Sequence, residues 1–197
     1  LNDDVVRAGA GFGTHPHDNM EIVSIPLSGA LAHKDSTGTS KVINTGDVQI
    51  MSAGSGISHS EFNASQKDAV NFLQVWVYPK LRDIKPRYDQ KTFDAAGRKN
   101  QWQTVVSPDE SDAGVWINQD ARFSLASLET GRELSYINKF SGNGVYVFVM
   151  DGEDEVAGNK LGKRDAIGIS ETDTVTIKAI SNASLMLIEI PMLTLND

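Results

Sequence analysis

Short runs rich in β-branched and aromatic residues recur along this chain, and polar turn residues (Gly, Asn, Asp or Ser) bound each of them. This pattern is typical of β-strands. The runs lie at 22–26, 48–51, 72–78, 146–150, 174–179 and 185–190. No helix of conventional length is indicated, and 17 glycines are available for turns. The pattern therefore predicts an all-β protein built from sandwiches or barrels.

A stretch rich in charge and proline, 79–108, interrupts the rhythm of short strands. Such a break is typical of a connection between domains. We therefore expect an inter-domain connection at 89–110, with an N-terminal domain at 1–88 and a C-terminal domain at 111–197.

The net charge of the chain limits the classes of partner that it can bind. A net charge of −8 and a pI near 5.0 mean that the protein repels phosphate backbones. The basic residues between 80 and 99 are interrupted by Asp83, Asp89 and Asp94, which indicates a solvated connecting segment rather than a nucleic-acid site. No apolar run approaches the ~20 residues of a membrane helix. We therefore expect no direct nucleic-acid partner and no membrane association.

The chain contains no cysteine. This excludes disulfides and thiolate ligands, and it leaves histidine and carboxylate as the metal donors. The absence fits a reducing cytoplasm, and residues 1–7 are acidic and polar rather than signal-like. We therefore expect a cytoplasmic protein.

Three of the four histidines fall in two short segments, one with His15 and His17 and one with His59 followed two residues later by Glu61. In an extended strand, side chains two residues apart point to the same face, so each segment offers two donors to one point. Imidazole and carboxylate together suit zinc, iron, nickel, copper or manganese, whereas calcium and magnesium prefer oxygen shells. The spacing therefore predicts a transition-metal site.

Glycines frame both histidine segments in the order of the two cupin motifs. The first motif comprises Gly9, His15, His17, Glu21 and Gly29, with only its last gap one residue longer than usual. The second comprises Gly46, Gly54, Gly56, His59 and Asn63, with Ser52 in place of the usual proline. The chain thus resembles the cupin superfamily, whose domains are antiparallel β-sandwiches of the jelly-roll type.

Over residues 3–95 the resemblance narrows to one family. The stretches that carry it are GFGTHPHDNMEIVSIPLSGALAHKDS, NTGDVQIMSAGSGISHSEFN, FLQVWVYP and KPRYDQKTFD, which look like the pirin family of bicupins. The resemblance implies two tandem cupin domains and one metal in the N-terminal domain. Its ligands would be His15, His17, His59 and Glu61. Pirins usually begin a few dozen residues earlier, so we expect this chain to be a fragment or to lack its true start.

A second carboxylate competes with Glu61 as the ligand. Glu21 is an even number of residues from His15 and His17, so on a continuous strand it would lie on the same face as they do. It also occupies the position of the carboxylate ligand in many cupins. The pirin resemblance favours Glu61 as the ligand. Glu21 would then be an outer partner that orients a histidine ligand. His33 lies outside both motifs and is interpreted as structural or as lining the rim of the site.

The C-terminal half offers no equivalent site, because no histidine follows His59. The expected strand and glycine turn at Gly29 nevertheless have a similar counterpart at Gly152. In both places a strand that begins with aspartate follows. We therefore expect the second half to be a cupin copy without metal ligands, with a structural role or a surface for a protein partner.

The resemblance also implies a reaction. Pirins are associated with quercetin 2,3-dioxygenase activity, the oxygen-dependent ring cleavage of a flavonol, in which Glu61 would be both ligand and base. The expected partners are thus a small aromatic substrate and dioxygen. We expect Fe²⁺ first, with Zn, Mn, Ni, Co or Cu as alternatives because the same ligands accept them.

Two other classes of function stay open. A non-catalytic regulator that senses metal or redox state would act through protein partners, in keeping with the regulatory roles also attributed to pirins. A Lewis-acid cupin isomerase or hydrolase acting on small polyols would need a polar, basic pocket. The acidic composition around the motifs makes this third class the least favoured.

Overall fold

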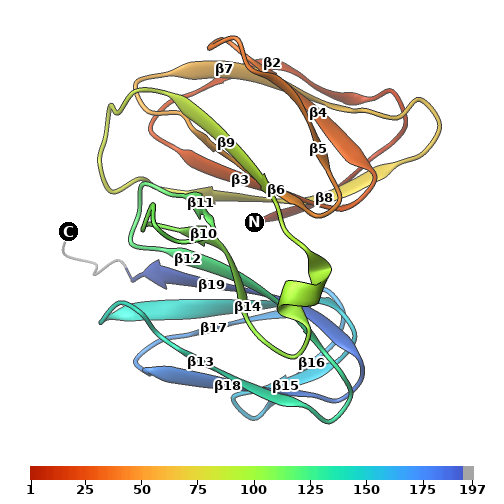
Figure 1. Cartoon of the computed structure of the whole chain (residues 1–197), viewed down its shortest axis with the longest axis vertical. Helices are drawn as coiled ribbons and strands as arrows, with labels where there is room; N and C mark the ends of the chain where they lie inside the picture. Colours follow the sequence, from red (N-terminus) through yellow and green to blue (C-terminus); the bar gives the residue numbers. More distant parts are fainter. Residues whose placement is uncertain (193–197) are drawn as a thin grey trace. The chain divides into compact units, whose positions relative to one another are not determined.

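The computed structural model describes residues 1–192, and almost all of its regular structure is β-strand (Figure 1). The one helical element among these residues is the short 3-10 helix η1 (Ala95–Arg98). No helix in the described part of the chain is long and apolar enough to cross a membrane. The prediction of an all-β protein is confirmed.

Unit 1 comprises Leu1–Phe93 and Pro108–Gln119, and its strands form two antiparallel sheets. The larger sheet has the order β1-β8-β3-β6-β9, with β1 (Asn2–Val6), β3 (Glu21–Ser28), β6 (Asp47–Ser52), β8 (Val70–Val77) and β9 (Arg87–Thr92). The smaller has the order β2-β7-β4-β5, with β2 (Gly11–His17), β4 (Ala30–Asp35), β5 (Ser40–Asn44) and β7 (Ile57–Asn63). A short strand, β11 (Val115–Trp116), contacts β6 and β9.

Unit 2 comprises Asp94–Ser107 and Asp120–Asp197, and its strands also form two antiparallel sheets. The larger contains β10 (Gln103–Ser107), β12 (Arg122–Leu128), β19 (Ala183–Pro191), β14 (Asn143–Asp151) and β17 (Ala166–Ile169) in that spatial order. The smaller contains β13 (Glu133–Ile137), β18 (Thr174–Ala179), β15 (Asp154–Val156) and β16 (Asn159–Leu161).

Apart from β9 and β10, the two units repeat one strand order. The larger sheets run β1-β8-β3-β6 and β12-β19-β14-β17, and the smaller sheets run β2-β7-β4-β5 and β13-β18-β15-β16. Gly29 and Gly152 lie in equivalent turns with φ of 77° and 88°. A Cβ on Gly152 would lie 2.3 Å from the carbonyl oxygen of Asn182, so this turn requires glycine. The similarity between the two halves of the sequence thus reflects two tandem β-sandwiches with the same topology.

The runs predicted as strands lie in β3, β6, β8, β14, β18 and β19, with Tyr78 just beyond the end of β8. Within 79–108, the stretch that interrupts the predicted strands, the structure contains β9 and β10. Among the described strands β9 pairs with β6 alone, and none of its residues is buried, so it lacks the apolar face that would have revealed it. The expected domain limits at 88 and 111 stay a prediction.

Apolar packing differs between the two units. In unit 2, buried residues from both sheets form one cluster that includes Val147, Ile177 and Leu187. In unit 1, smaller clusters of buried residues form around Phe72 and around Met51, and other buried apolar residues, among them Ile50 and Leu73, lie outside both. Unit 1 also buries polar side chains that belong to neither cluster: Ser24, His33, His59, Glu61 and Gln74.

Asp154, at the start of β15, is a buried carboxylate in unit 2. The residue is 0% exposed, and neither carboxylate oxygen has a hydrogen-bond partner among the described residues. Burial raises the pKa of Asp154 to about 6, whereas a solvated aspartate has a pKa of about 3.9. The unfolded chain therefore loses this proton at lower pH than the folded chain. The free energy of unfolding should fall by on the order of 2–3 kcal/mol as the pH rises from about 4 to above 6.

We expect the Asp154→Asn variant, which cannot ionise, to gain stability relative to the wild type as the pH rises from about 4 to about 7. Urea titrations at both pH values, followed through the fluorescence of Trp102 in unit 2, measure this difference. Glu155→Gln, on the exposed face of the same strand, is the control. A stability difference between Asp154→Asn and the wild type that is the same at both pH values would contradict the assignment.

Candidate metal centre

The pairing of β2 with β7 brings three histidines together in unit 1. His15 and His59 are direct cross-strand partners, and His17 lies two residues along β2. Nε2 of His15 is 3.1 Å from Nε2 of His59. The ring centroid of His17 is 4.8 Å from that of His15 and 5.0 Å from that of His59. One nitrogen from each ring can thus face a common point.

Local sequence features allow this close pairing. A Cβ on Gly11 would lie 2.4 Å from the carbonyl oxygen of Glu61, so β2 and β7 can approach here only because residue 11 is glycine. The register shifts between Phe12 and His15, a bulge of the kind that re-aims side chains next to functional sites. Pro16, between the two histidines, fixes its own φ in the extended range.

A second group shares His59 and is more deeply buried. It consists of His33, His59 and Glu61, which are 2%, 2% and 3% exposed. His33, on β4, is the cross-strand partner of Glu61, and its Nδ1 lies 3.5 Å from Nδ1 of His59. Nε2 of His33 lies 3.0 Å from Oδ2 of Asp35. His33 is therefore a buried neighbour of the site and does not line its rim.

The carboxylate of Glu61 is held by a polar chain from β8. Nε2 of Gln74 donates to Oε2 of Glu61 at 2.8 Å, and Oε1 of Gln74 accepts from Nε1 of Trp76 at 3.0 Å. The indole of Trp76 also packs edge-on against His17, with ring centroids 4.9 Å apart. Our sequence reasoning missed both residues. The signal was a glutamine inside an apolar strand, two residues before a tryptophan and thus on the same face.

Glu21 belongs to neither group of donors. Asn19 has a positive φ of 42° between β2 and β3, and the two strands belong to different sheets, so Glu21 does not continue the face of His17. Its Oε2 accepts from the hydroxyl of Ser52 at 2.8 Å and from the backbone N–H of Asn118 at 3.2 Å. Burial raises the pKa of Glu21. The choice of Glu61 as the ligand stays a prediction.

Burial and mutual proximity favour the neutral form of His17 and His59. Burial and the three neighbouring histidines lower the pKa of His59 to about 3. Burial and His15 also lower the pKa of His17. A neutral imidazole offers a lone pair to a metal without first losing a proton. Burial raises the pKa of Glu61 in spite of its hydrogen bonds, which brings this carboxyl closer to neutral pH as a proton acceptor.

These donors fit a transition-metal ion. Nε2 of His17 is buried and has no hydrogen-bond partner among the described residues. The Nε2 atoms of His15 and His59, at 3.1 Å, have the spacing of two nitrogens that each lie about 2.0–2.1 Å from one ion. Three imidazoles with a nearby carboxylate are a donor set for first-row transition metals rather than for calcium or magnesium.

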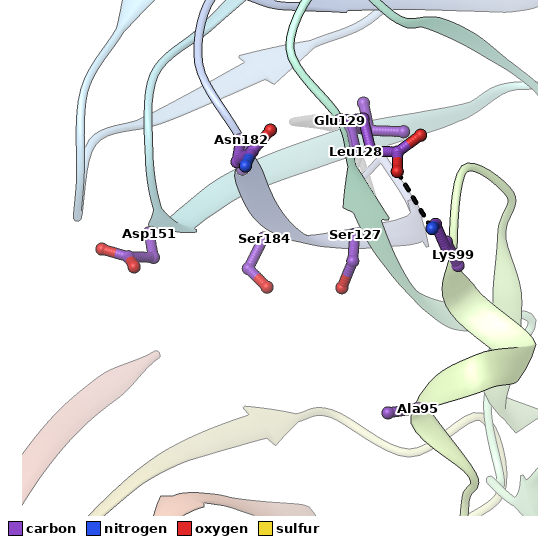
Figure 2. Close-up of a pocket in the computed structure, with 9 residues that line it drawn as sticks. Ala95, Lys99, Ser127, Leu128, Glu129, Asp151, Asn182 and Ser184 are labelled. Atoms are coloured by element: carbon purple, nitrogen blue, oxygen red, sulfur yellow. Dashed lines mark ion pairs between the residues drawn. The ribbon is translucent and has the colours of Figure 1, made fainter.

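Unit 2 contains a hollow of about 410 Å³ with different chemistry. Ser127, Asp151 and Ser184 are among the residues that line it, and Nζ of Lys99 forms an ion pair with Glu129 at 2.9 Å (Figure 2). This half of the chain has no histidine. The described residues of unit 2 therefore offer no counterpart of the imidazole cluster.

Comparison with known proteins places these features in a family. Residues 1–77 match the family model for pirin, and residues 104–190 match that for the quercetinase C-terminal cupin domain. A quercetin 2,3-dioxygenase of Escherichia coli (strain K12) is 37% identical over 192 residues, which cover 97% of this chain and 81% of that protein. The chain belongs to the pirin family. A pirin-like protein of Caulobacter vibrioides is 35% identical to this pirin over 189 residues, covering 95% of this chain and 81% of the relative.

Solved structures share the fold of this pirin. The crystal structure of YhhW from E. coli matches it with a TM-score of 0.92 at 35% identity, covering 97% of this chain and 80% of that one. The structure of the bacterial pirin YhhW in complex with nickel(II), also from E. coli, matches with a TM-score of 0.90 at 34% identity, covering 97% and 81%. The expected pirin family and tandem cupin fold are thus confirmed.

Proposed function

We propose that this pirin is a metal-dependent dioxygenase of the quercetin 2,3-dioxygenase type, which cleaves the ring of a flavonol or related aromatic substrate. The observation that carries the proposal is the convergence of three imidazoles, one of which has a buried Nε2 without a hydrogen-bond partner among the described residues, in a chain related to proteins named quercetin 2,3-dioxygenase. The ligands are His15, His17, His59 and Glu61. Fe²⁺ is the metal expected, although a related pirin holds nickel(II) and the same donors accept several metals.

A metal bound by these residues supplies Lewis acidity and one-electron chemistry toward dioxygen. Glu61 is the group of this chain that moves a proton. Its buried carboxylate, with a raised pKa, accepts the proton of the flavonol hydroxyl and can later return it. Gln74 fixes the orientation of that carboxylate through its hydrogen bond to Oε2. The flavonol is thereby held as its anion, the form that dioxygen attacks.

The surroundings of His17 suit an aromatic substrate. A hollow of about 600 Å³ lies beside His17, and its lining combines the apolar Met20 and Ile57 with polar residues such as Asp18. This volume is within the range of sites for small organic ligands. The indole of Trp76, which is 47% exposed and packs against His17, offers an aromatic surface next to the same imidazole.

Flavonol consumption by the iron-loaded protein tests the proposal. Turnover should require dioxygen, saturate with flavonol and fall at least ~100-fold in the His17→Ala variant, because dioxygen and substrate both depend on the bound metal. Thr14→Ala, one residue before His15 and exposed, is the matched control and should stay near wild type. A protein that binds flavonol without turnover would overturn the enzyme assignment in favour of the sensor. Oxygen-independent conversion of a polyol would favour the Lewis-acid isomerase or hydrolase.

A further inference from the structure

His33 and Asp35 lie next to His59, on the side of its ring that faces away from His15. Nε2 of His33 lies 3.0 Å from Oδ2 of Asp35, and Nδ1 of His33 lies 3.5 Å from Nδ1 of His59. The other nitrogen of His59, Nε2, lies 3.1 Å from Nε2 of His15. The four side chains thus form a continuous line of polar contacts from a buried carboxylate to the candidate metal position.

Asp35 determines which nitrogen of His33 carries the proton. Oδ1 of Asp35 already accepts from the backbone N–H groups of Thr37 and Thr39, at 2.9 and 3.1 Å, and from the hydroxyl of Thr37 at 2.7 Å. An ionised carboxylate only accepts, so the contact with Oδ2 requires the proton on Nε2 of His33. Nδ1 of a neutral His33 is then an acceptor.

His33 accepts the proton of His59 when an ion is bound. Nδ1 of His15 donates to the carbonyl oxygen of Gly13 at 2.8 Å, so Nε2 of His15 carries a lone pair that faces Nε2 of His59 at 3.1 Å. An ion between these two nitrogens requires the lone pair of His59 on Nε2 as well. The proton of His59 then lies on Nδ1, where Nδ1 of His33 accepts it at 3.5 Å.

We propose that Asp35 and His33 are positioning residues that fix the tautomer and ring orientation of His59 for metal binding through Nε2. The inference rests on the metal centre proposed above. His33 itself stays off the metal, because Asp35 and His59 use both of its nitrogens. The side chains of His33 and Asp35 are 0% exposed, so water does not compete for their contact. Outer partners of this kind typically alter metal affinity about 10- to 100-fold.

The decisive variant is Asp35→Asn. If the asparagine oxygen keeps the bonds to Thr37 and Thr39, its NH₂ group replaces Oδ2 and donates to Nε2 of His33. The protons on both imidazoles must then exchange nitrogens, which leaves Nε2 of His59 protonated. We expect the affinity for cobalt(II), followed by its visible absorption in competition with a chelator, to fall about 10- to 100-fold. Imidazole ¹⁵N shifts of the zinc-loaded wild type should show the proton of His59 on Nδ1 and that of His33 on Nε2.

Two further variants serve as a control and as a second, independent test. Thr37→Val removes a hydroxyl bond to the other oxygen of Asp35 and should leave cobalt affinity within about twofold of wild type, well below the effect of an outer partner. His33→Leu retains an apolar side chain in the same place but removes the acceptor for His59. Its cobalt affinity should fall as in Asp35→Asn, which decides the matter if Asp35→Asn does not fold.

Three results would overturn the inference. These are cobalt affinity unchanged in both Asp35→Asn and His33→Leu, zinc bound to Nδ1 rather than Nε2 of His59 in the zinc-loaded wild type, and two cobalt ions per chain, which would make His33 a ligand. The ¹⁵N and cobalt measurements need no substrate. A wild type that binds metal with the expected tautomer but turns over no flavonol would thus count against the proposed function, whereas the role of His33 would stand.

Discussion

The His59→Ala variant is expected to lose its metal while keeping its fold. His59 is shared by both donor groups, and its ring contacts His15 on one side and His33 on the other, so its removal takes away the central ligand. Elemental analysis of protein purified without added metal should give about one metal per chain for the wild type. The variant should bind at least ~100-fold more weakly, beyond the range for outer partners.

Ser60→Ala is the matched control, because Ser60 follows His59 on the opposite face of β7. It should retain the wild-type metal content. Circular dichroism should show strand content unchanged in both variants, because the apolar clusters of unit 1 do not include His59. Full metal occupancy in both His15→Ala and His59→Ala would refute the site.

The two buried glutamates of unit 1 are expected to differ sharply in how much their replacement lowers turnover. Glu61→Gln should reduce flavonol turnover by about 10²- to 10⁴-fold, because the amide cannot accept the substrate proton. Glu21→Gln should reduce turnover far less, since Glu21 bonds Ser52 and Asn118 rather than a histidine. Parallel measurement of metal content and of the rate under saturating dioxygen separates loss of ligand from loss of base. A larger loss in Glu21→Gln would show that the general cupin pattern, not the pirin pattern, describes the site.

Much of the fold is predictable because buried strands carry their own signal. β3 and β8 are apolar runs flanked by turn residues, so their burial can be inferred without knowledge of their neighbours. β9 has no such run, since this edge strand of partly exposed residues is stabilised by backbone pairing with β6 and by polar side-chain bonds rather than by an apolar face. Its existence depends on a partner far along the chain, which a local pattern does not report.

The same distinction applies to the candidate site. His15 and His17 are recognisable because their spacing within one strand is local. The contact of His33 with His59 depends instead on the register between β4 and β7, and the bond of Gln74 to Glu61 depends on the packing of one sheet against the other. An even spacing in the sequence does not place two residues on one face when a turn separates them. The positive φ of Asn19 separates Glu21 from the face of His17, although their spacing would align them on a continuous strand.

The buried polar groups of unit 1 have a consequence for how this pirin can change. Ser24, His33, His59, Glu61 and Gln74 are buried and belong to neither of the apolar clusters around Phe72 and Met51. An ion that binds only the folded state would offset part of the free-energy cost of burying them. Substitutions that improve apolar packing in unit 2 can accumulate without touching the proposed site. An apolar substitution at one of the buried polar positions of unit 1 removes a group of the site even where it stabilises the fold, so evolution can raise stability more freely in one half than in the other.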